Sequence, residues 1–202
     1  MRLRFSPASP FVRKVRVAAL VLGLDDRITK EAGDTMNPAD TLRGENPLGK
    51  IPTLITDDGT TLFDSRVILE YLDHLAGGGR IIPAAPDRRF PVLRLQALAD
   101  GILDASVLIV YEGRYRPAEH RVESWVELQA GKVSRAMAAL EAAPPAGSGA
   151  VPDVGQIALA CALGYLDFRF KGEWRAAHPR LVAWLDDFAA RVPAFEATRP
   201  PG

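Results

Sequence analysis

The chain has 202 residues, 48% of them hydrophobic and 25% charged, which suits one large domain or two small ones with a buried core. Its 25 Lys and Arg balance 25 Asp and Glu, and a net charge of zero argues against nucleic acid or an anionic membrane as the main partner. The single cysteine, Cys161, excludes an intramolecular disulfide and suits a reducing cytoplasm.

The longest apolar runs of the sequence are short. VAALVLG and ASVLIVY fall well below the roughly 20 residues that a membrane-spanning helix requires. The N-terminal stretch MRLRFSPASP has no apolar core before its first prolines, so we expect no signal peptide. These features predict a cytoplasmic protein without a membrane partner.

The first third of the chain alternates between strand and helix patterns. RLRF near the N-terminus has apolar and charged side chains in turn, which predicts a short half-buried strand with its arginines on the solvent face. Pro10 opens an amphipathic run and Ser9 before it is a typical cap, so we expect a helix that ends near Gly23. RITKEAG predicts a second strand, and the turn-rich NPADTLRGENPLGK contains one helical turn.

A hairpin and a helix complete this first part. TLIT, DDGT and TLF predict two antiparallel strands, with Asp58 and Gly59 at the turn positions of positive φ. DSRVILEYLDHLAGGG then carries an apolar stripe at helical spacing and ends in a glycine run. The pattern predicts an α/β domain over residues 1–80. The antiparallel hairpin and the absence of a glycine-rich phosphate loop exclude a doubly wound dinucleotide-binding fold.

Beyond residues 82–86 the periodicity is helical only, so we place a domain boundary there. Asp153 and Gln156 form a capping box for a helix that is apolar nearly all round, as expected for a helix in the middle of a bundle. We expect residues 86–202 to form an all-α domain, with AAPPAGSGAVP as a loop. The predicted helices are FPVLRLQALADGILDASVLIVYEGRYR, AEHRVESWVELQAGKVSRAMAALEAA, DVGQIALACALGYLDFRF and PRLVAWLDDFAARV.

Four motifs follow one another along this pattern: SPFVRKV, NPLGKIPTL, FDS and DVGQIALACALGYLDFR. The ordered set spans the chain and resembles the cytosolic glutathione S-transferases, in their small bacterial branch. The resemblance implies a thioredoxin-like domain of order βαβαββα at residues 1–80 and a helical bundle at residues 86–202. It further implies glutathione as a co-substrate, no permanently bound cofactor, and a homodimer formed through the third helix and the two long helices.

The resemblance places glutathione on the first domain. It implies that the Ile51–Pro52 peptide bond is cis and that the backbone of Ile51 pairs with the cysteinyl part of the tripeptide. Asp64 and Ser65 begin a helix whose positive end favours a carboxylate; Ser65 can add its hydroxyl, and Asp64 can either meet the γ-glutamyl ammonium or only cap the helix. Lys50 can meet the glycyl carboxylate or stay a solvated lysine.

Catalysis in this family requires the glutathione thiolate, because the thiolate rather than the thiol is the nucleophile. Ser9 can accept a backbone N–H as the helix cap and still donate its hydroxyl proton to the sulfur. Ser6 is the alternative, although Pro7 and Ala8 separate it from the helix. Catalysis by a tyrosine near the first strand is excluded because the tyrosines all lie far along the chain, at Tyr71, Tyr111, Tyr115 and Tyr165.

The second substrate would lie between the domains, with Phe11, Tyr111, Arg114 and Tyr115 as candidate walls. We expect a small hydrophobic electrophile that is conjugated, or a peroxide that is reduced; isomerase and dehalogenase activities use the same thiolate and stay open. The alternative is a non-catalytic protein of this fold that acts through protein contacts. A thioredoxin-like disulfide reductase is excluded because the chain lacks a C-x-x-C pair.

The remaining reactive or charged residues have structural interpretations. Cys161 lies in an apolar run and is expected to be a small buried hydrophobe. Arg13 and Arg16 on the first helix are expected to form a salt bridge with a neighbouring helix. The three histidines are scattered without the spacing of metal ligands, so no metal site is expected.

Overall fold

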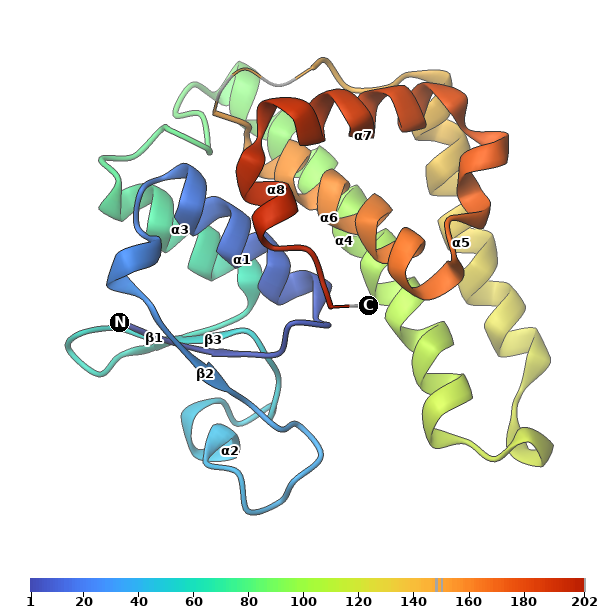
Figure 1. The fold of residues 1–202 in the computed structure, drawn as a ribbon, viewed down its shortest axis with the longest axis horizontal. Helices are drawn as coiled ribbons and strands as arrows, with labels where there is room; N and C mark the ends of the chain where they lie inside the picture. Colours follow the sequence, from blue (N-terminus) through green and yellow to red (C-terminus); the bar gives the residue numbers. More distant parts are fainter. Residues whose placement is uncertain (148, 150, 202) are drawn as a thin grey trace.

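The chain folds into a small sheet with helices on both sides, followed by a bundle of longer helices (Figure 1). The computed structural model describes residues 1–147, 149 and 151–201. The predicted loop AAPPAGSGAVP therefore includes two positions, 148 and 150, that lie outside the described residues, as does residue 202.

The first part has the predicted order of strands and helices. A four-stranded sheet has the strand order β2-β1-β3-β4, in which β1 pairs parallel with β2 and antiparallel with β3, and β3 pairs antiparallel with β4. Helices α1 and α3 lie side by side on one face of this sheet, and α2 lies on the other (Figure 1). The elements are β1 (Arg2–Phe5), α1 (Pro10–Val21), a 3-10 turn (Asp25–Arg27), β2 (Thr29–Ala32), α2 (Leu42–Glu45), β3 (Thr53–Ile55), β4 (Thr61–Leu62) and α3 (Ser65–Leu75).

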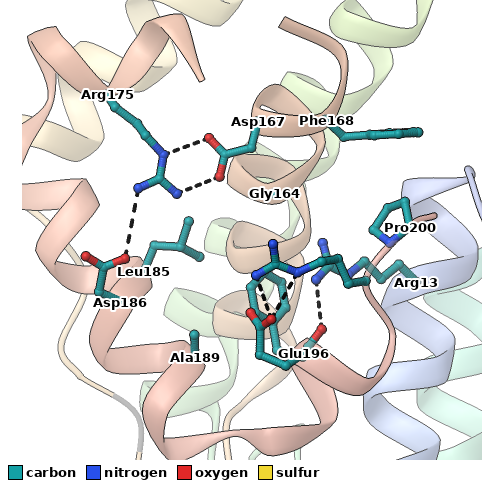
Figure 2. A pocket seen from close by; sticks show the side chains of 12 residues that line it. Arg13, Gly164, Asp167, Phe168, Arg175, Leu185, Asp186, Ala189, Glu196 and Pro200 are labelled. Atoms are coloured by element: carbon teal, nitrogen blue, oxygen red, sulfur yellow. Dashed lines mark hydrogen bonds and ion pairs between the residues drawn. The ribbon is translucent and has the colours of Figure 1, made fainter. Parts of the chain in front are cut away.

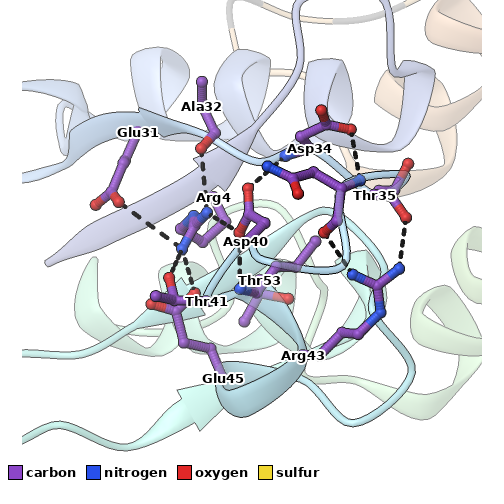
Figure 3. Close-up of polar contacts among 12 residues, drawn as sticks. Arg4, Glu31, Ala32, Asp34, Thr35, Asp40, Thr41, Arg43, Glu45 and Thr53 are labelled. Carbon is purple, nitrogen blue, oxygen red and sulfur yellow. Dashed lines mark hydrogen bonds and ion pairs between the residues drawn. The ribbon is translucent and has the colours of Figure 1, made fainter.

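The charged face of β1 is not solvated as its alternation predicts. Arg4 is only 2% exposed, because its guanidinium is enclosed by carboxylates: Nη2 lies 2.5 Å from Asp40 and Nη1 lies 2.7 Å from Glu45 (Figure 3). The pKa of Asp40 is lowered, first by the backbone N–H groups of Asp34 and Leu42 that it accepts and further by Arg4. This Arg4 cluster ties the turn-rich segment 33–50 to the sheet.

The hairpin turn differs from its prediction at one position. Gly59 has a φ of +87°, as expected, but among the described non-glycine residues only Lys171 has a positive φ. Asp58 instead uses its side chain, which accepts the Thr60 N–H at 3.0 Å and the Thr56 hydroxyl at 2.5 Å. The loop that joins β3 to β4 therefore needs only one residue of positive φ, Gly59, because hydrogen bonds to the Asp58 carboxylate close the rest of the turn.

The second part is helical, and each of the four predicted helices is confirmed. The first begins at Pro86, earlier than predicted, and continues through Pro91, a residue that usually ends a helix. A further short helix near the C-terminus was not predicted. The elements are α4 (Pro86–Tyr115), α5 (Glu123–Ala142), α6 (Val154–Phe170), α7 (Pro179–Arg191) and α8 (Pro193–Ala197), with 3-10 turns at Ala118–His120 and Glu173–Ala177.

Helix α6 is the centre of the bundle, as its apolar sequence predicts. It packs against both α4 and α1, and its residues from Val154 to Leu163 are buried all round. Asp153 and Gln156 form the predicted capping box, with bonds of 2.9 and 3.0 Å between side chains and backbone N–H groups. The contact of α6 with α1 joins the helical bundle to the sheet domain.

The connection between α3 and α4 is fixed by one carboxylate. Asp73 is buried and accepts the backbone N–H groups of Gly79, Arg80 and Ile81 at 2.8, 2.9 and 2.8 Å. Ile81 in turn accepts the N–H of Val154, at the start of α6, at 3.0 Å. The linker is therefore held to both domains.

We expect Asp73→Ala to lower the free energy of unfolding by about 3 kcal/mol, because one buried and two partly buried N–H groups lose a charged acceptor. Urea denaturation followed by circular dichroism measures this change. The control His74→Ala alters the exposed neighbour on the same helix and should stay within about 0.5 kcal/mol of wild type. Equal stability of both variants would show that Asp73 does not hold the linker.

Candidate functional site

The sheet brings three of the predicted site segments to one edge. The register places Arg4 opposite Thr53 and Leu54 opposite Leu62, so the ends of β1 and β4 lie beside the start of β3. The predicted segments come directly after β1, before β3 and after β4, and the same edge therefore carries all of them. They are Ser9 with Pro10, Lys50 to Pro52, and Asp64 with Ser65.

Ser9 caps α1 as predicted. Its backbone is extended, with φ −81° and ψ 121°, and its hydroxyl oxygen accepts the N–H of Val12 at 3.3 Å. Its carbonyl accepts the N–H of Arg13 at 3.0 Å, which is the first bond of the helix. The cap uses a lone pair of the hydroxyl oxygen, so the O–H hydrogen is available to an acceptor at the positive end of the helix.

Ser6 lies at the opposite end of the turn that joins β1 to α1. Its carbonyl accepts the N–H of Ser9 at 3.1 Å, and both serine side chains are partly buried. Ser6 therefore precedes the turn, whereas Ser9 stands at the helix end. This difference favours Ser9 for any interaction that depends on the helix dipole.

The Ile51–Pro52 peptide bond is cis, as the resemblance implies. Within the described residues, neither the N–H nor the C=O of Ile51 has a hydrogen-bond partner, and the ladder with β1 begins only at Thr53. The buried Asn46 supports this bend, because its Nδ2 donates to the Lys50 carbonyl at 3.0 Å and to the Thr53 hydroxyl at 3.1 Å. The structure thus adds Asn46, which sequence reasoning missed although it lies in the NPLGK motif.

Asp64 and Ser65 begin α3. Asp64 is the cap, since Oδ1 accepts the N–H of Arg66 at 2.9 Å, and it follows a cis Phe63–Asp64 bond. Ser65 is buried in the first turn, and the side chain of Lys50 is exposed. The capping function of Asp64 is thereby confirmed, and its second carboxylate oxygen stays available at the helix N-terminus.

A buried ion pair joins the two domains behind this edge. Lys14 of α1 is fully buried and its Nζ donates to Oδ1 of Asp100 in α4, which is 1% exposed. The other oxygen of Asp100 accepts Nε of Arg66 in α3 at 2.8 Å. Burial, followed by the Asp100 carboxylate, raises the pKa of Asp104, while Arg66, Lys14 and Lys50 lower it. Sequence reasoning missed this cluster, whose members lie far apart in the chain.

The predicted walls of the second-substrate site fall into two groups. Tyr111 and Tyr115 form an edge-to-face pair with ring centroids 5.0 Å apart, and the guanidinium of Arg114 lies 6.0 Å from the Tyr115 ring. Phe11 lies on α1, where its ring is 5.3 Å from Nζ of Lys14. No described contact joins Phe11 to the tyrosines.

Helix α6 adds two residues beside this tyrosine pair. Burial is the main cause that raises the pKa of Tyr165, and Tyr111 raises it further. Arg169 and Arg114 act in the opposite direction and lower it. The guanidinium of Arg169 lies 4.1 Å from the ring of Phe168, and its Nε is buried without a hydrogen-bond partner in the described part of the chain. Tyr165 and Arg169 were not predicted as wall residues, because the α6 sequence is apolar nearly all round and indicates a helix in the middle of the bundle.

Two structural expectations have different outcomes. Among the described residues neither Arg13 nor Arg16 forms the predicted salt bridge; Nη2 of Arg13 donates instead to the carbonyl of Phe195 at 2.8 Å, and Nε of Arg16 is buried without a hydrogen-bond partner there. Cys161 is buried, and desolvation raises the pKa of its thiol to about 11, so it behaves as the expected hydrophobe.

Neither a cluster of metal-ligating side chains nor a helix able to span a membrane is present among the described residues. No group of three or more His, Cys, Asp or Glu side chains there could hold a metal ion. No helix within the same ranges combines the length and apolar character that crossing a membrane requires.

Comparison with known proteins places the chain in a family. The model of the glutathione S-transferase N-terminal domain matches residues 8–75, and that of the C-terminal domain matches residues 123–187. The GST-like protein YibF of Escherichia coli K12 is 35% identical over all of this chain and 99% of its own. The chain belongs to the glutathione S-transferase family.

Solved structures of a glutathione transferase family member from Pseudomonas fluorescens Pf-5 show the same fold. One contains bound glutathione; it is 44% identical, has a TM-score of 0.90, and the match covers 100% of this chain and 99% of that one. The other contains S-(propanoic acid)-glutathione; it is 45% identical over the full length of both chains, with a TM-score of 0.89. The predicted glutathione S-transferase fold is confirmed.

Lys14→Met is expected to lower the free energy of unfolding of this protein by about 3 kcal/mol, because it leaves the buried Asp100 carboxylate without its buried partner. The double variant Lys14→Met, Asp100→Leu removes both charges and should recover most of that loss. Urea denaturation of the wild-type protein, the Lys14→Met and Asp100→Leu single variants and the double variant tests the coupling. If the two substitutions simply add their costs, Lys14 and Asp100 do not act as a pair.

Proposed function

We propose that this protein is a cytoplasmic glutathione transferase in which Ser9 stabilises the glutathione thiolate for attack on a small hydrophobic electrophile. The observation that carries the proposal is the shared sheet edge, where Ser9, the unpaired backbone of Ile51 and the first turn of α3 lie together. A tripeptide with a thiol in its centre and carboxylates at both ends needs three such positions. Bound glutathione in the Pseudomonas fluorescens relative supports this assignment.

Each end of glutathione has a complementary group on this edge. The γ-glutamyl carboxylate meets the free N–H groups and the positive dipole at the start of α3, together with the hydroxyl of Ser65. One oxygen of Asp64 caps that helix, and the other takes the α-ammonium. The cysteinyl backbone pairs with the N–H and C=O of Ile51 beside Pro52, and Lys50 takes the glycyl carboxylate.

The reaction begins with loss of the thiol proton to solvent. A free thiol has a pKa of roughly 8.5, and a hydroxyl donor at a positive helix end lowers it by stabilising the thiolate. Ser9 donates its O–H to the sulfur while its lone pair keeps the Val12 N–H. The thiolate then uses an electron pair to form the bond to the electrophilic carbon, and a leaving group departs with the pair of the broken bond.

The second substrate lies between the domains in this proposal. Tyr111, Arg114 and Tyr115 of α4 supply an aromatic and cationic wall, to which α6 adds Tyr165 and Arg169. The S-(propanoic acid)-glutathione bound by the Pseudomonas fluorescens relative carries a group on sulfur, which favours conjugation over the other thiolate reactions.

The proposal is tested by calorimetric titration with glutathione, followed by turnover assays with a panel of alkyl halides, epoxides, activated alkenes and hydroperoxides. We expect glutathione to bind and at least one class of electrophile to turn over. Binding without any turnover would favour the non-catalytic alternative that acts through protein contacts. Failure to bind glutathione would remove both the site and the activity.

Ser9→Ala is expected to lower kcat about a hundredfold, because the developing thiolate loses a preorganised donor. The Kd of glutathione should change less than about threefold, since other groups hold the tripeptide ends. The ultraviolet absorbance of the bound thiolate, followed with pH, should show that the pKa of the glutathione thiol is higher in Ser9→Ala than in the wild-type protein. Ser6→Ala is the matched control. A larger loss of kcat in Ser6→Ala than in Ser9→Ala would assign the stabilisation of the thiolate to Ser6 instead of Ser9.

We further propose that the protein is a homodimer. Exposed apolar side chains lie on α3 and the first half of α4, at Val67, Phe90 and Leu98, and Phe90 is 67% exposed. Others lie on α5, at Trp125 and Leu128. Such side chains favour a protein interface on these helices.

Light scattering after size-exclusion chromatography should give twice the chain mass of 21.9 kDa. Phe90→Asp should shift the protein toward the monomer, because it places a charge in the apolar contact. Met36→Asp is the control, since Met36 is also exposed, at 61%, but lies in the segment before α2. A wild-type protein that elutes at the monomer mass contradicts the dimer.

A further inference from the structure

Two arginines at one end of the helical domain have no carboxylate partner in the described part of the chain. Helices α4 and α6 run side by side in the same direction (Figure 1), and Arg114 and Arg169 lie in their last turns. Nε of Arg169 is buried and has no hydrogen-bond partner among the same residues. A helix C-terminus offers a cation only about half an elementary negative charge, so the two helix ends leave about one positive charge without a counter-ion.

The acidic side chain closest to Arg114 in the sequence is engaged elsewhere. Glu112 is buried, lies 2.9 Å from Nε of Arg116 and accepts the N–H of Val122 at 3.0 Å. It therefore ties the end of α4 to the start of α5 and does not balance Arg114.

The corresponding acidic side chain of α6 is also paired. Asp167 accepts Nε and Nη2 of Arg175 at 2.9 and 2.6 Å, and it points away from Phe168, which lies on the other side of α6 (Figure 2). The guanidinium of Arg169 lies 4.1 Å from the ring of Phe168. The charge of Arg169 is therefore on the side of α6 that Asp167 does not face.

Three tyrosines surround the two arginines. Tyr111 and Tyr115 pack edge to face, and the guanidinium of Arg114 lies 6.0 Å from the Tyr115 ring, as that of Arg169 does from the Tyr165 ring. Burial raises the pKa of Tyr165, Arg169 and Arg114 lower it, and Tyr111 raises it, so the α4 and α6 members lie within electrostatic reach of one another. Hydroxyl and guanidinium groups are hydrogen-bond donors, and together they suit a carboxylate acceptor.

The α4 members of this tyrosine–arginine cluster lie on the face of the helix that meets the sheet domain. At 3.6 residues per turn, positions 100, 111 and 115 fall within about 60° of one another around the axis. Asp100 faces Lys14 of α1 and Arg66 of α3. Tyr111 and Tyr115 therefore continue, along α4, the face that begins at the domain contact.

The α6 members lie beside the first turn of α1. Tyr165 follows Gly164, where an added Cβ would come within 2.5 Å of Nη1 of Arg13. The N–H of Arg13 is bonded to the carbonyl of Ser9 at 3.0 Å. The cluster is thus separated from the helix turn of Ser9 by about the length of one arginine side chain.

We propose that the second substrate is an electrophile that carries a carboxylate on an apolar body, and that Arg114 and Arg169 bind this carboxylate. The inference rests on the proposed transferase function and names the substrate class of the same site. The tyrosine rings contact the apolar body, and the hydroxyls of Tyr111 and Tyr165 donate to the carboxylate. The carboxylate itself is unchanged in the reaction: the thiolate forms the S–C bond, and the leaving group departs with the electron pair of the broken bond.

Calorimetric titration with two glutathione conjugates tests the charge of the substrate. S-(4-carboxymethylbenzyl)glutathione and its neutral carboxamide analogue carry the same benzyl body on the sulfur. We expect the carboxylate to bind about tenfold more tightly, since charge-assisted hydrogen bonds replace neutral ones. Equal affinities, in a protein that binds glutathione, would overturn this inference alone. A protein that does not bind glutathione would overturn the proposed function together with it.

Variants of single arginines locate the carboxylate. Arg114→Gln and Arg169→Gln should each remove most of the preference for the carboxylate and change the affinity of the carboxamide less than about twofold. Arg94→Gln is the matched control, because it removes the same charge from an exposed position in the first half of α4. Circular dichroism establishes that each variant folds. If Arg169→Gln does not fold, Arg114→Gln at its exposed position decides alone, and a wild-type preference in that variant refutes the site.

Discussion

The antiparallel pairing of β3 with both β1 and β4 is the constraint on which the candidate site depends. Because the end of one outer strand and the end of the other lie beside the start of the central one, two helix N-termini and an unpaired stretch of backbone meet along one edge. Each of these features is common by itself. Their combination presents a row of N–H donors and positive dipoles at which a peptide with two carboxylates and a thiol can be held.

Asp100 of the helical domain binds side chains of both helices that begin at this edge, α1 and α3. Lys14 and Asp100 are charges that burial would penalise singly, and their pairing across α1 and α4 commits the two domains to one arrangement. Arg66 connects the same carboxylate to the first turn of α3. The helix that carries Ser9 and the helix that starts at Ser65 are therefore fixed to the same residue of the bundle, so their separation is set by side chains outside the sheet.

Local patterns in the sequence were sufficient for most of the fold. Ser9 with Pro10, Asp153 with Gln156, and the apolar stripe of α3 are signals within a few residues of one another, and the structure contains the corresponding cap, capping box and helix. The order of these elements also indicated the family. Such signals do not depend on the rest of the chain, which is why they could be interpreted before the fold was known.

The interactions that sequence reasoning missed join distant parts of the chain. Arg4 was expected on a solvent face and Lys14 was given no function, and only the tertiary fold brings carboxylates from positions 40, 45 and 100 to them. Arg13 was expected to pair with a carboxylate, but its guanidinium donates to a backbone carbonyl instead. In α4, tertiary packing against α6 outweighs the tendency of Pro91 to end the helix.

The Arg4 cluster gives the segment 33–50 an unusual source of order. Leu42 and Asn46 are its only buried side chains, so ionic contacts to Arg4 replace the apolar core that normally holds a connecting segment. Asp40 has a lowered pKa in the folded chain, so its contribution is full above the unfolded pKa and is lost as pH falls through the folded value. In acid this segment, which leads into Ile51, should be the part of the domain whose amide hydrogens exchange first.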